Sequence, residues 1–188
     1  MTEITNQQAS IDRPGHSDAP QGAERVYALI ILVEDRPGAV DRVVGVLRRR
    51  RANMQTLTLG RGGLSDSSIV RISVFVSDSE VGIDHLVEQL RKIVDVQRVV
   101  NLPYQQSVSR ELALIKVSST AENVNAIIDL GTLFGARVLE ITPETITLEV
   151  TNSEESIEKL VVLLQSYGIR DVARSGSVAI ARGADEND

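Results

Sequence analysis

An unbroken apolar run near the start of the chain is followed at once by a segment with helical periodicity. Val26–Val33 is short and rich in branched residues, which favours a buried strand. After a turn at Glu34–Gly38, apolar residues recur at the spacing of one buried helical stripe, at Val40, Val43, Val44 and Leu47. A second strand begins at Asn53, where apolar residues are interleaved with polar or β-compatible ones. The opening segment is therefore predicted to be strand, helix and strand.

The next segment completes one structural unit. The glycine-rich stretch Gly60–Asp66 separates two strand-like runs, which predicts a hairpin whose second strand spans Ser67–Val76. A helix with an apolar stripe and a final strand at Val94–Leu102 follow. The order is β-α-β-β-α-β, which is typical of the ferredoxin-like arrangement, one antiparallel sheet with two helices on one face.

The same order recurs in the second half of the chain. The predicted elements are the strand Arg110–Val117, the helix Ala121–Phe134, the strands Ala136–Ile141 and Thr145–Val150, the helix Glu154–Tyr167 capped by Asn152 or Ser153, and the strand Ile169–Arg182 with a bend at Ser175–Gly176. We therefore expect an α+β fold of two tandem ferredoxin-like βαββαβ domains. Their expected ranges are 25–102 and 110–183, with a linker at 103–109, a polar disordered tail at 1–24 and an acidic tail at 184–188.

Composition narrows the possible partners. The 188-residue chain has a net charge of −6, a pI near 5.0 and 3% aromatic residues, so it lacks the basic surface and the stacking residues of most nucleic-acid-binding proteins. An RNA-binding module of the same strand order would need exposed aromatics on its central strands, where this chain has Leu57, Thr58, Ile72 and Val74. The run Arg48–Arg51 could bind an acidic partner. However, cations are stabilised at a helix C-terminus and runs of charge are usually solvent-exposed, which favours a solvated helix end.

Residue usage also indicates a compartment. The chain has no Cys, no apolar run of membrane-spanning length and no signal-peptide pattern at its first residues. We expect a cytoplasmic protein that does not bind membranes.

The sequence contains no recognisable catalytic constellation. Without Cys, a triad would have to recruit His16 from the polar tail or His85 from a surface face of a helix, and two distant histidines make no metal site. Glu34 and Asp35 are adjacent on a turn, so their side chains diverge and a shared acid–base role is not expected. Motifs for phosphate cradles and zinc peptidases are absent. The residues favour a binding or regulatory role.

The turn at Glu34–Gly38 is the candidate binding element. Asp35 is placed to cap the helix, Pro37 suits a first helical turn, and Gly38 allows a close approach to the backbone. The N–H groups of Gly38, Ala39 and Val40 at a helix N-terminus favour an anion, and Asp35 could receive an ammonium group. An α-amino acid carries both charges. The alternative is a well-made helix start without a ligand, which these local residues alone favour.

Four blocks of this sequence resemble the small, regulatory subunit of acetolactate synthase, also called acetohydroxyacid synthase. They occur in that family's order and cover nearly everything except the two tails: LVEDRPGAVDRVVGVLRRRRANMQTLTL at Leu32–Leu59, KIVDVQRVVNL at Lys92–Leu102, SRELALIKV at Ser109–Val117 and GIRDVARSGSVAIARG at Gly168–Gly183. The first half resembles an ACT domain, an amino-acid sensor, and the second resembles the C-terminal domain of the family. The hairpin loop Gly60–Asp66 departs from the usual family pattern.

The resemblance implies a noncatalytic subunit that activates a thiamine-diphosphate-dependent catalytic subunit and confers feedback inhibition by a branched-chain amino acid, usually valine. It implies a homodimer through the ACT domain and no cofactor in this chain, with thiamine diphosphate, Mg and FAD in the catalytic partner. The alternative is a free-standing ACT-type amino-acid sensor with no acetolactate synthase partner.

The resemblance also implies an effector site at the interface of two ACT domains, formed by the turn after the first strand and by the start of the second strand. The residues carried over are Asp35, Gly38, Ala39, Val40, Asn53 and Met54. The amides of Gly38 and Ala39 would receive the carboxylate, Asp35 and Asn53 would orient the charged groups, and Met54 would line the aliphatic pocket. Many members have Asn at the position of Asp35. The acidic side chain of Asp35 would favour an ammonium and repel a misplaced carboxylate.

Overall fold

The computed structural model describes residues 25–62 and 68–183. The predictions for the polar tail with His16, for the acidic tail and for part of the Gly60–Asp66 loop lie outside these residues. In the described part of the chain, no helix has the length and apolar character needed to cross a bilayer.

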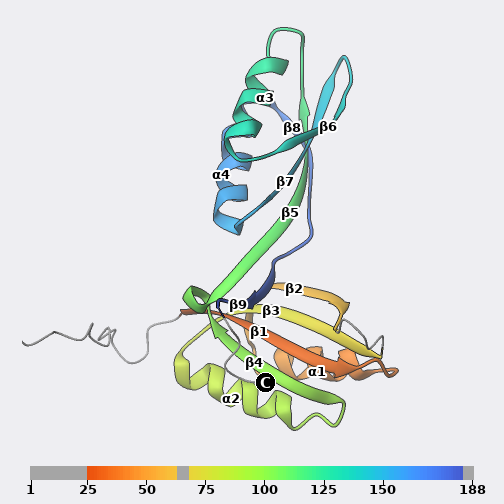
Figure 1. Ribbon diagram of the computed structural model, residues 1–188, viewed down its shortest axis with the longest axis vertical. Coiled ribbons are helices and arrows are strands. Elements are labelled where there is room, and N and C mark those ends of the chain that lie inside the picture. The colour runs from red at the N-terminus through yellow and green to blue at the C-terminus, as the bar shows by residue number, and fades with distance from the viewer. Residues whose placement is uncertain (1–24, 63–67, 184–188) are drawn as a thin grey trace, which may run out of the picture.

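The first half folds as the periodicity predicts. Its elements are β1 (Arg25–Glu34), α1 (Ala39–Arg49), β2 (Asn53–Arg61), β3 (Ile69–Asp78), α2 (Glu80–Arg91) and β4 (Val96–Pro103). The antiparallel sheet has the order β2-β3-β1-β4, so β1 and β3, the two strands that precede the helices, lie at its centre. Both helices cover one face, the lower one in Figure 1. The ferredoxin-like prediction is confirmed for this half.

The core of the first half lies between the sheet and its two helices. Alternate residues of β1, from Tyr27 to Val33, pack against Val43 and Leu47 of α1 and against the stripe of α2. Full burial of each branched side chain contributes about 1.5–3 kcal/mol, which fixes the helical face of the sheet. His85 and the Arg48–Arg51 run are exposed, as expected for residues off these stripes.

The second half repeats the arrangement. Its elements are η1 (Tyr104–Gln106), β5 (Ser107–Ser118), α3 (Val124–Leu133), β6 (Arg137–Ile141), β7 (Thr145–Asn152), α4 (Glu154–Leu164), η2 (Gln165–Tyr167), β8 (Ile169–Arg174) and β9 (Val178–Ala181). The sheet order β6-β7-β5-β8 matches that of the first half. Helices α3 and α4 again cover one face, and the core between them includes Ile115, Leu148 and Leu160. The prediction of two tandem βαββαβ units is confirmed.

The structure differs from the sequence prediction where the two halves meet. The stretch 103–109, expected as a linker, contains the end of β4, the short helix η1 and the first residues of β5. The last predicted strand, Ile169–Arg182, is two strands that pair with different parts of β5: β8 with Ala113–Val117 and β9 with Ser107–Arg110. The bend at Ser175–Gly176 separates them.

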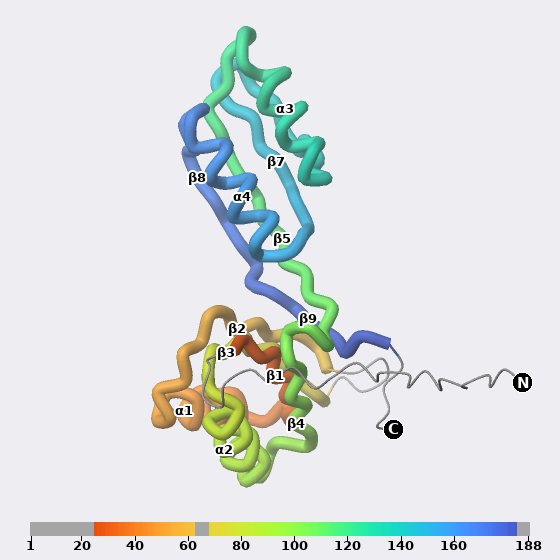
Figure 2. The backbone as a smooth tube through the Cα atoms, turned by 90° about the vertical axis from the view of Figure 1, so that its left-hand side faces the viewer, coloured from red at the N-terminus to blue at the C-terminus, as the bar shows by residue number. Residues whose placement is uncertain are grey.

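Strand β9 pairs with β5 but packs against the first sheet. Figures 1 and 2 show the chain descending from β8 and crossing the face of the first sheet that the helices leave uncovered. Ala179, only 2% exposed, packs there with Ala28, Ile30, Phe75 and Leu102. Arg71 on β3 donates to the Ala179 carbonyl at 2.6 Å, and Thr58 on β2 donates to the Ser177 carbonyl at 3.3 Å. The ribbon of β9 and the start of β5 therefore joins the two halves.

Candidate functional site

The turn between β1 and α1 is fixed from both sides by backbone hydrogen bonds. The Glu34 amide donates to the Asp95 carbonyl at 2.9 Å, and the Asp35 amide donates to the Ser68 carbonyl at 2.6 Å. Gly38 has φ +79° and is the N-cap of α1, with no side-chain cap. The prediction that Asp35 caps this helix is wrong, because its side chain is exposed and the left-handed glycine makes the turn instead.

The helix start leaves backbone donors for an anion. The Ala39 amide already donates to the Arg36 carbonyl at 3.0 Å. Within the described residues, the amides of Gly38 and Val40 have no hydrogen-bond partner. They lie at the positive end of the α1 dipole, where a carboxylate is stabilised. Of the amides expected to bind, those of Gly38 and Val40 are thus the ones available.

The structure adds Arg42 to this turn. A Cβ built on Gly38 would lie 3.2 Å from its Nη1 atom. Its Nε and Nη2 atoms each lie 2.6 Å from Oδ2 of Asp95, whose side chain is 3% exposed. This ion pair holds the guanidinium beside the bare Gly38 backbone. The sequence signal was the spacing of four between Gly38 and Arg42, which places the two on one helical face.

Asn53 and Met54 lie at the opposite end of the same sheet. Asn53 pairs with Ser77, which on its other side pairs with Val26 at the start of β1. The β1–α1 turn instead follows the end of β1, where Val33 pairs with Val70. Seven residue steps along β3 separate these positions, which corresponds to about 23 Å at about 3.3 Å per residue. One chain therefore does not bring the two groups of predicted site residues together.

The edge strand β2 exposes apolar side chains on the helical face of the sheet. Met54, Leu57 and Leu59 pair with the core residues Val76, Val74 and Ile72, so they point to the same side as the helices. Met54 is 38% exposed and Leu59 is 54% exposed. Exposed apolar residues on an unpaired edge are typical of a surface that another chain covers.

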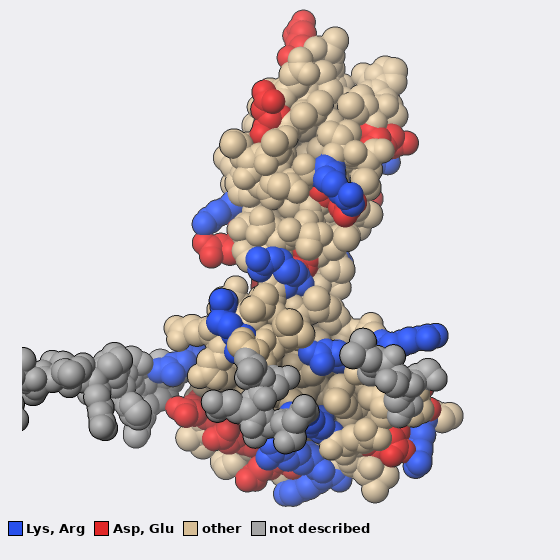
Figure 3. Space-filling model, in the orientation of Figure 1, with Lys and Arg blue, Asp and Glu red and all other residues tan. Residues whose placement is uncertain are grey.

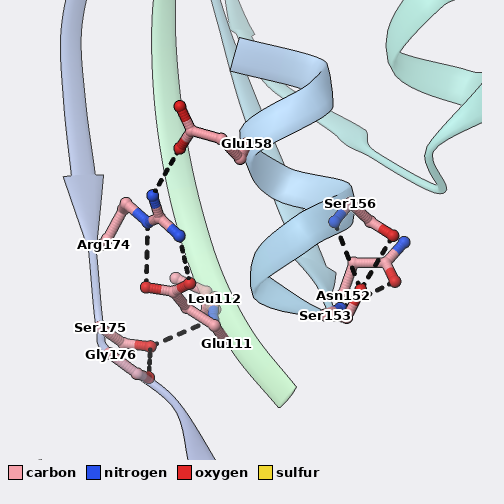
Figure 4. Close-up of polar contacts among 9 residues, drawn as sticks. All are labelled: Glu111, Leu112, Asn152, Ser153, Ser156, Glu158, Arg174, Ser175 and Gly176. Atoms are coloured by element: carbon pink, nitrogen blue, oxygen red, sulfur yellow. Dashed lines mark hydrogen bonds and ion pairs between the residues drawn. The ribbon is translucent and has the colours of Figure 1, made fainter. Parts of the chain in front are cut away.

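The strongest polar network of the second half was not foreseen from the sequence (Figure 4). Arg174 on β8 donates to both carboxylate oxygens of Glu111 on β5, at 3.0 and 2.7 Å, and also to Glu158 on α4 at 3.1 Å. The hydrogen bond to Glu111 raises the pKa of Arg174. Glu111 is 2% exposed, and this bidentate pair ties β5 to β8, while the contact with Glu158 adds α4.

Figure 4 also shows how α4 begins. Ser153 is its N-cap and accepts from the Ser156 amide at 3.3 Å, while the Asn152 side chain accepts from the Ser153 amide at 2.9 Å. Of the two caps considered from the sequence, Ser153 is therefore the one. In residues 25–62 and 68–183, no group of three or more His, Cys, Asp or Glu side chains is placed to hold a metal ion.

Comparison with known proteins assigns both halves. Residues 110–183 match the family described as small subunit of acetolactate synthase, and residues 29–98 match the AHAS small subunit-like ACT domain. The acetolactate synthase small subunit of Mycolicibacterium smegmatis is 40% identical over 157 residues, which cover 84% of this chain and 91% of that protein. Its counterpart from Mycobacterium bovis is 36% identical over 159 residues, which cover 85% and 94%.

A solved structure agrees with these sequence matches. The crystal structure of the acetolactate synthase small subunit from Thermotoga maritima superposes with a TM-score of 0.78 at 26% identity. The match covers 86% of this chain and 99% of that chain.

Proposed function

The chain belongs to the family of acetolactate synthase small subunits, and we propose that it activates a catalytic subunit and makes it sensitive to feedback inhibition by a branched-chain amino acid, with valine as the first candidate. The catalytic subunit would carry thiamine diphosphate, Mg and FAD, and this chain would carry no cofactor. The observation that supports an amino-acid effector most directly is the start of α1, where the Arg42 guanidinium and two amides that have no partner among the described residues surround the bare backbone of Gly38.

The chemistry of this turn suits the two charges of an amino acid. In the proposed site, the effector carboxylate accepts from the Gly38 and Val40 amides and from Arg42. Asp35, which is exposed beside them, receives the ammonium. The side chain of Ala39 is buried in the core, so in the proposed site this residue contributes only the backbone position at the start of α1.

The remaining predicted residues would come from a second copy of the chain. If two β2 edges pair antiparallel, the start of one β2 lies opposite the end of the other. That end reaches Arg61, which pairs with Val70 beside the β1–α1 turn. Asn53 of one copy would then face the turn of the other copy, and Met54 would supply an apolar wall. The pairing would also cover Leu59 and the unpaired edge. We therefore propose a dimer whose two effector sites each need both chains.

Inhibition would be a coupling between effector binding and activation. If the effector binds one arrangement of the dimer more tightly, and that arrangement activates less, the activity falls as the site fills. Couplings of this kind are typically about 1–3 kcal/mol, which corresponds to about 5- to 150-fold in affinity.

The test is acetolactate synthase activity of the catalytic subunit from the same organism, measured with and without this chain and titrated with valine, leucine and isoleucine. We expect activation by this chain and its reversal by one of the three amino acids. Activation without inhibition would refute the effector site. A lack of both activation and co-purification would refute the subunit assignment and favour a free-standing amino-acid sensor.

A further inference from the structure

A large groove runs between the two halves of the molecule. Its volume is about 1370 Å³, and it opens at the end of the first sheet where β1 begins and β4 ends. One wall comes from β1, the start of α2 and η1, and the other comes from α4 and Phe134. In Figure 3 the outline of the molecule narrows where the two halves meet, with both acidic and basic side chains on the left-hand side near the narrowing. We call this feature the interdomain groove.

Most of the aromatic residues of the chain line the interdomain groove. The chain has only three Tyr and two Phe. Four of these five residues line this one surface, namely Tyr27, Phe75, Tyr104 and Phe134, although Tyr27 and Phe75 are themselves buried. Tyr104 is 46% exposed, and the neighbouring Val162 and Leu163 on α4 are 53% and 47% exposed. Aromatic residues and exposed apolar side chains in a concave surface are typical of the anchoring part of a protein–protein interface.

The rim of the interdomain groove is acidic. Five carboxylate side chains line it, against two cationic ones, Arg25 and Lys159; the carboxylates are those of Glu80, Asp84, Glu154, Glu155 and Glu158. Glu155 pairs with Lys159 at 2.6 Å, and Glu158 pairs with Arg174 at 3.1 Å. In the described part of the chain, the other three carboxylates form no ion pair. The groove therefore favours a cationic occupant.

Two polar groups in the interdomain groove point to the same chemistry. The Oδ1 atom of Asn101 is buried and, among the described residues, has no hydrogen-bond donor. Burial raises the pKa of Tyr27, and the carboxylates of Glu80 and Asp84 raise it further. An Arg or Lys side chain entering the groove would supply a donor, neutralise the carboxylates and stack against the exposed ring of Tyr104.

The interdomain groove also touches the strand that carries part of the proposed effector site. Gln55 lines the groove and directly follows Met54. It is the extra residue of a β-bulge, because Met54 pairs with Val76 and Thr56 pairs with Phe75. The Gln55 side chain donates to Ser77 at 2.9 Å. Asn53 and Met54 are therefore only one or two residues from the groove wall, and a movement of either residue on effector binding would also move Gln55.

We propose that the interdomain groove is the docking site for a segment of the acetolactate synthase catalytic subunit that carries Arg or Lys beside an apolar or aromatic anchor. This proposal rests on the proposed function. A second copy of this chain is a poorer occupant. If the copies pair through β2, the Arg48–Arg51 run of the second copy lies at the opposite end of the sheet, and the chain as a whole has a net charge of −6.

The first test reverses charge at the interdomain groove. In the full-length protein, Asp84→Arg and Glu154→Arg are combined, and the dissociation constant for the catalytic subunit is measured by titrating activation. We expect it to rise about tenfold or more, since like charges across an interface are strongly unfavourable. The matched control combines Glu88→Arg on α2 with Glu140→Arg on β6. Both residues are exposed and lie outside the groove, and the change in net charge is the same. The control should bind within about twofold of the wild type.

A second test probes the apolar anchor without changing charge. Tyr104→Ala should also weaken binding about tenfold, because aromatic residues dominate interface energetics, whereas Leu133→Ala, at a residue 82% exposed outside the groove, should not. Circular dichroism and sedimentation report whether fold and self-association are intact.

The outcomes separate this proposal from the proposed function. If the wild-type chain neither binds nor activates the catalytic subunit, the proposed function fails. If the wild type binds and both groove variants bind equally well, only the docking proposal is overturned. It is also overturned if the groove variants weaken self-association instead, because the occupant would then be a second copy.

Discussion

At the scale of single residues, Gly38 does two things at once. Its left-handed backbone makes the turn into α1, and its missing side chain leaves the neighbouring amides and Arg42 open to a ligand. Any other residue at position 38 would strain the left-handed backbone and would also block the approach of the ligand. Two substitutions with equal backbone strain but different charge therefore separate these effects.

Gly38→Asp should abolish effector inhibition while leaving activation of the catalytic subunit largely intact. The new carboxylate would lie near the proposed effector carboxylate, and we expect the effector concentration for half-inhibition to rise about a hundredfold or more. Gly38→Asn is the control, because it has the same shape and tolerates the same backbone but carries no charge. It should retain more sensitivity than the Asp variant. Unchanged sensitivity in Gly38→Asp would refute the assignment of this turn.

The buried Glu111–Arg174 pair predicts a difference between two neighbouring carboxylates. Glu111→Gln should lower the free energy of unfolding by about 1–3 kcal/mol, because it removes the bidentate partner of a guanidinium whose side chain is 30% exposed. Glu158 binds the same guanidinium but is 59% exposed, so Glu158→Gln should cost less than about 1 kcal/mol. Urea denaturation measures both. Equal effects would show that burial does not decide the strength of this network.

Two features of the β1–α1 turn could not be predicted from local residue preferences, namely the residue that caps α1 and the position of Arg42. Asp35 is a good N-cap by type, but Gly38 three positions later makes a left-handed turn, and the helix begins after it. Arg42 was not among the predicted site residues, because its spacing of four from Gly38 does not show that Asp95 will hold it there. Contacts between residues 53 positions apart depend on the completed fold.

At the scale of elements, periodicity predicted the helices and strands of both halves well. Strands such as β7, whose buried and partly exposed residues alternate, and helices with one apolar stripe carry strong local signals. The bend predicted at Ser175–Gly176 marks where Ile169–Arg182 divides into β8 and β9, but nothing local showed that β9 would cover the first sheet, because both strands pair antiparallel with β5. Which sheet a strand covers is a tertiary property.

The edge strand β2 predicts how the chain self-associates. Leu59→Lys should raise the dissociation constant of the proposed dimer about tenfold or more, because a lysine on an edge strand opposes pairing of two edges. Its effect on the fold should be small, since Leu59 is 54% exposed. Ile141→Lys is a matched control: the residue is 55% exposed and lies on β6, the corresponding edge of the second sheet. Sedimentation equilibrium distinguishes the two. Dissociation by Ile141→Lys alone would place the dimer contact on the second half.

At the scale of the whole molecule, the predicted site residues are separated by strand order. The sequence suggested which residues form it, but their positions follow from the order β2-β3-β1-β4, which puts the turn and Asn53 at opposite ends of the sheet. The proposed second copy restores their proximity. No local pattern in one chain encodes the proposed arrangement, which would be a property of the assembly rather than of the fold.

The ribbon of β9 and Ser107–Arg110 predicts a local opening that can be measured. Ala179→Asp would bury a carboxylate among Ala28, Ile30 and Phe75, and detaching β9 from the first sheet costs less than keeping that charge buried. In hydrogen exchange, we expect the amides of this ribbon to lose protection while those of β7 keep theirs. Ile180→Asp is the control.

Ile180 is the next residue of β9 but is 61% exposed, so an aspartate there stays in water and the ribbon should stay closed. Loss of protection throughout both halves in Ala179→Asp would mean that the contact of Ala179 is needed for the whole fold. Unchanged protection would mean that the hydrogen bonds from Arg71 and Thr58 hold the ribbon without it. Only a loss confined to β9 and its partner residues agrees with two folded halves joined by one separable ribbon.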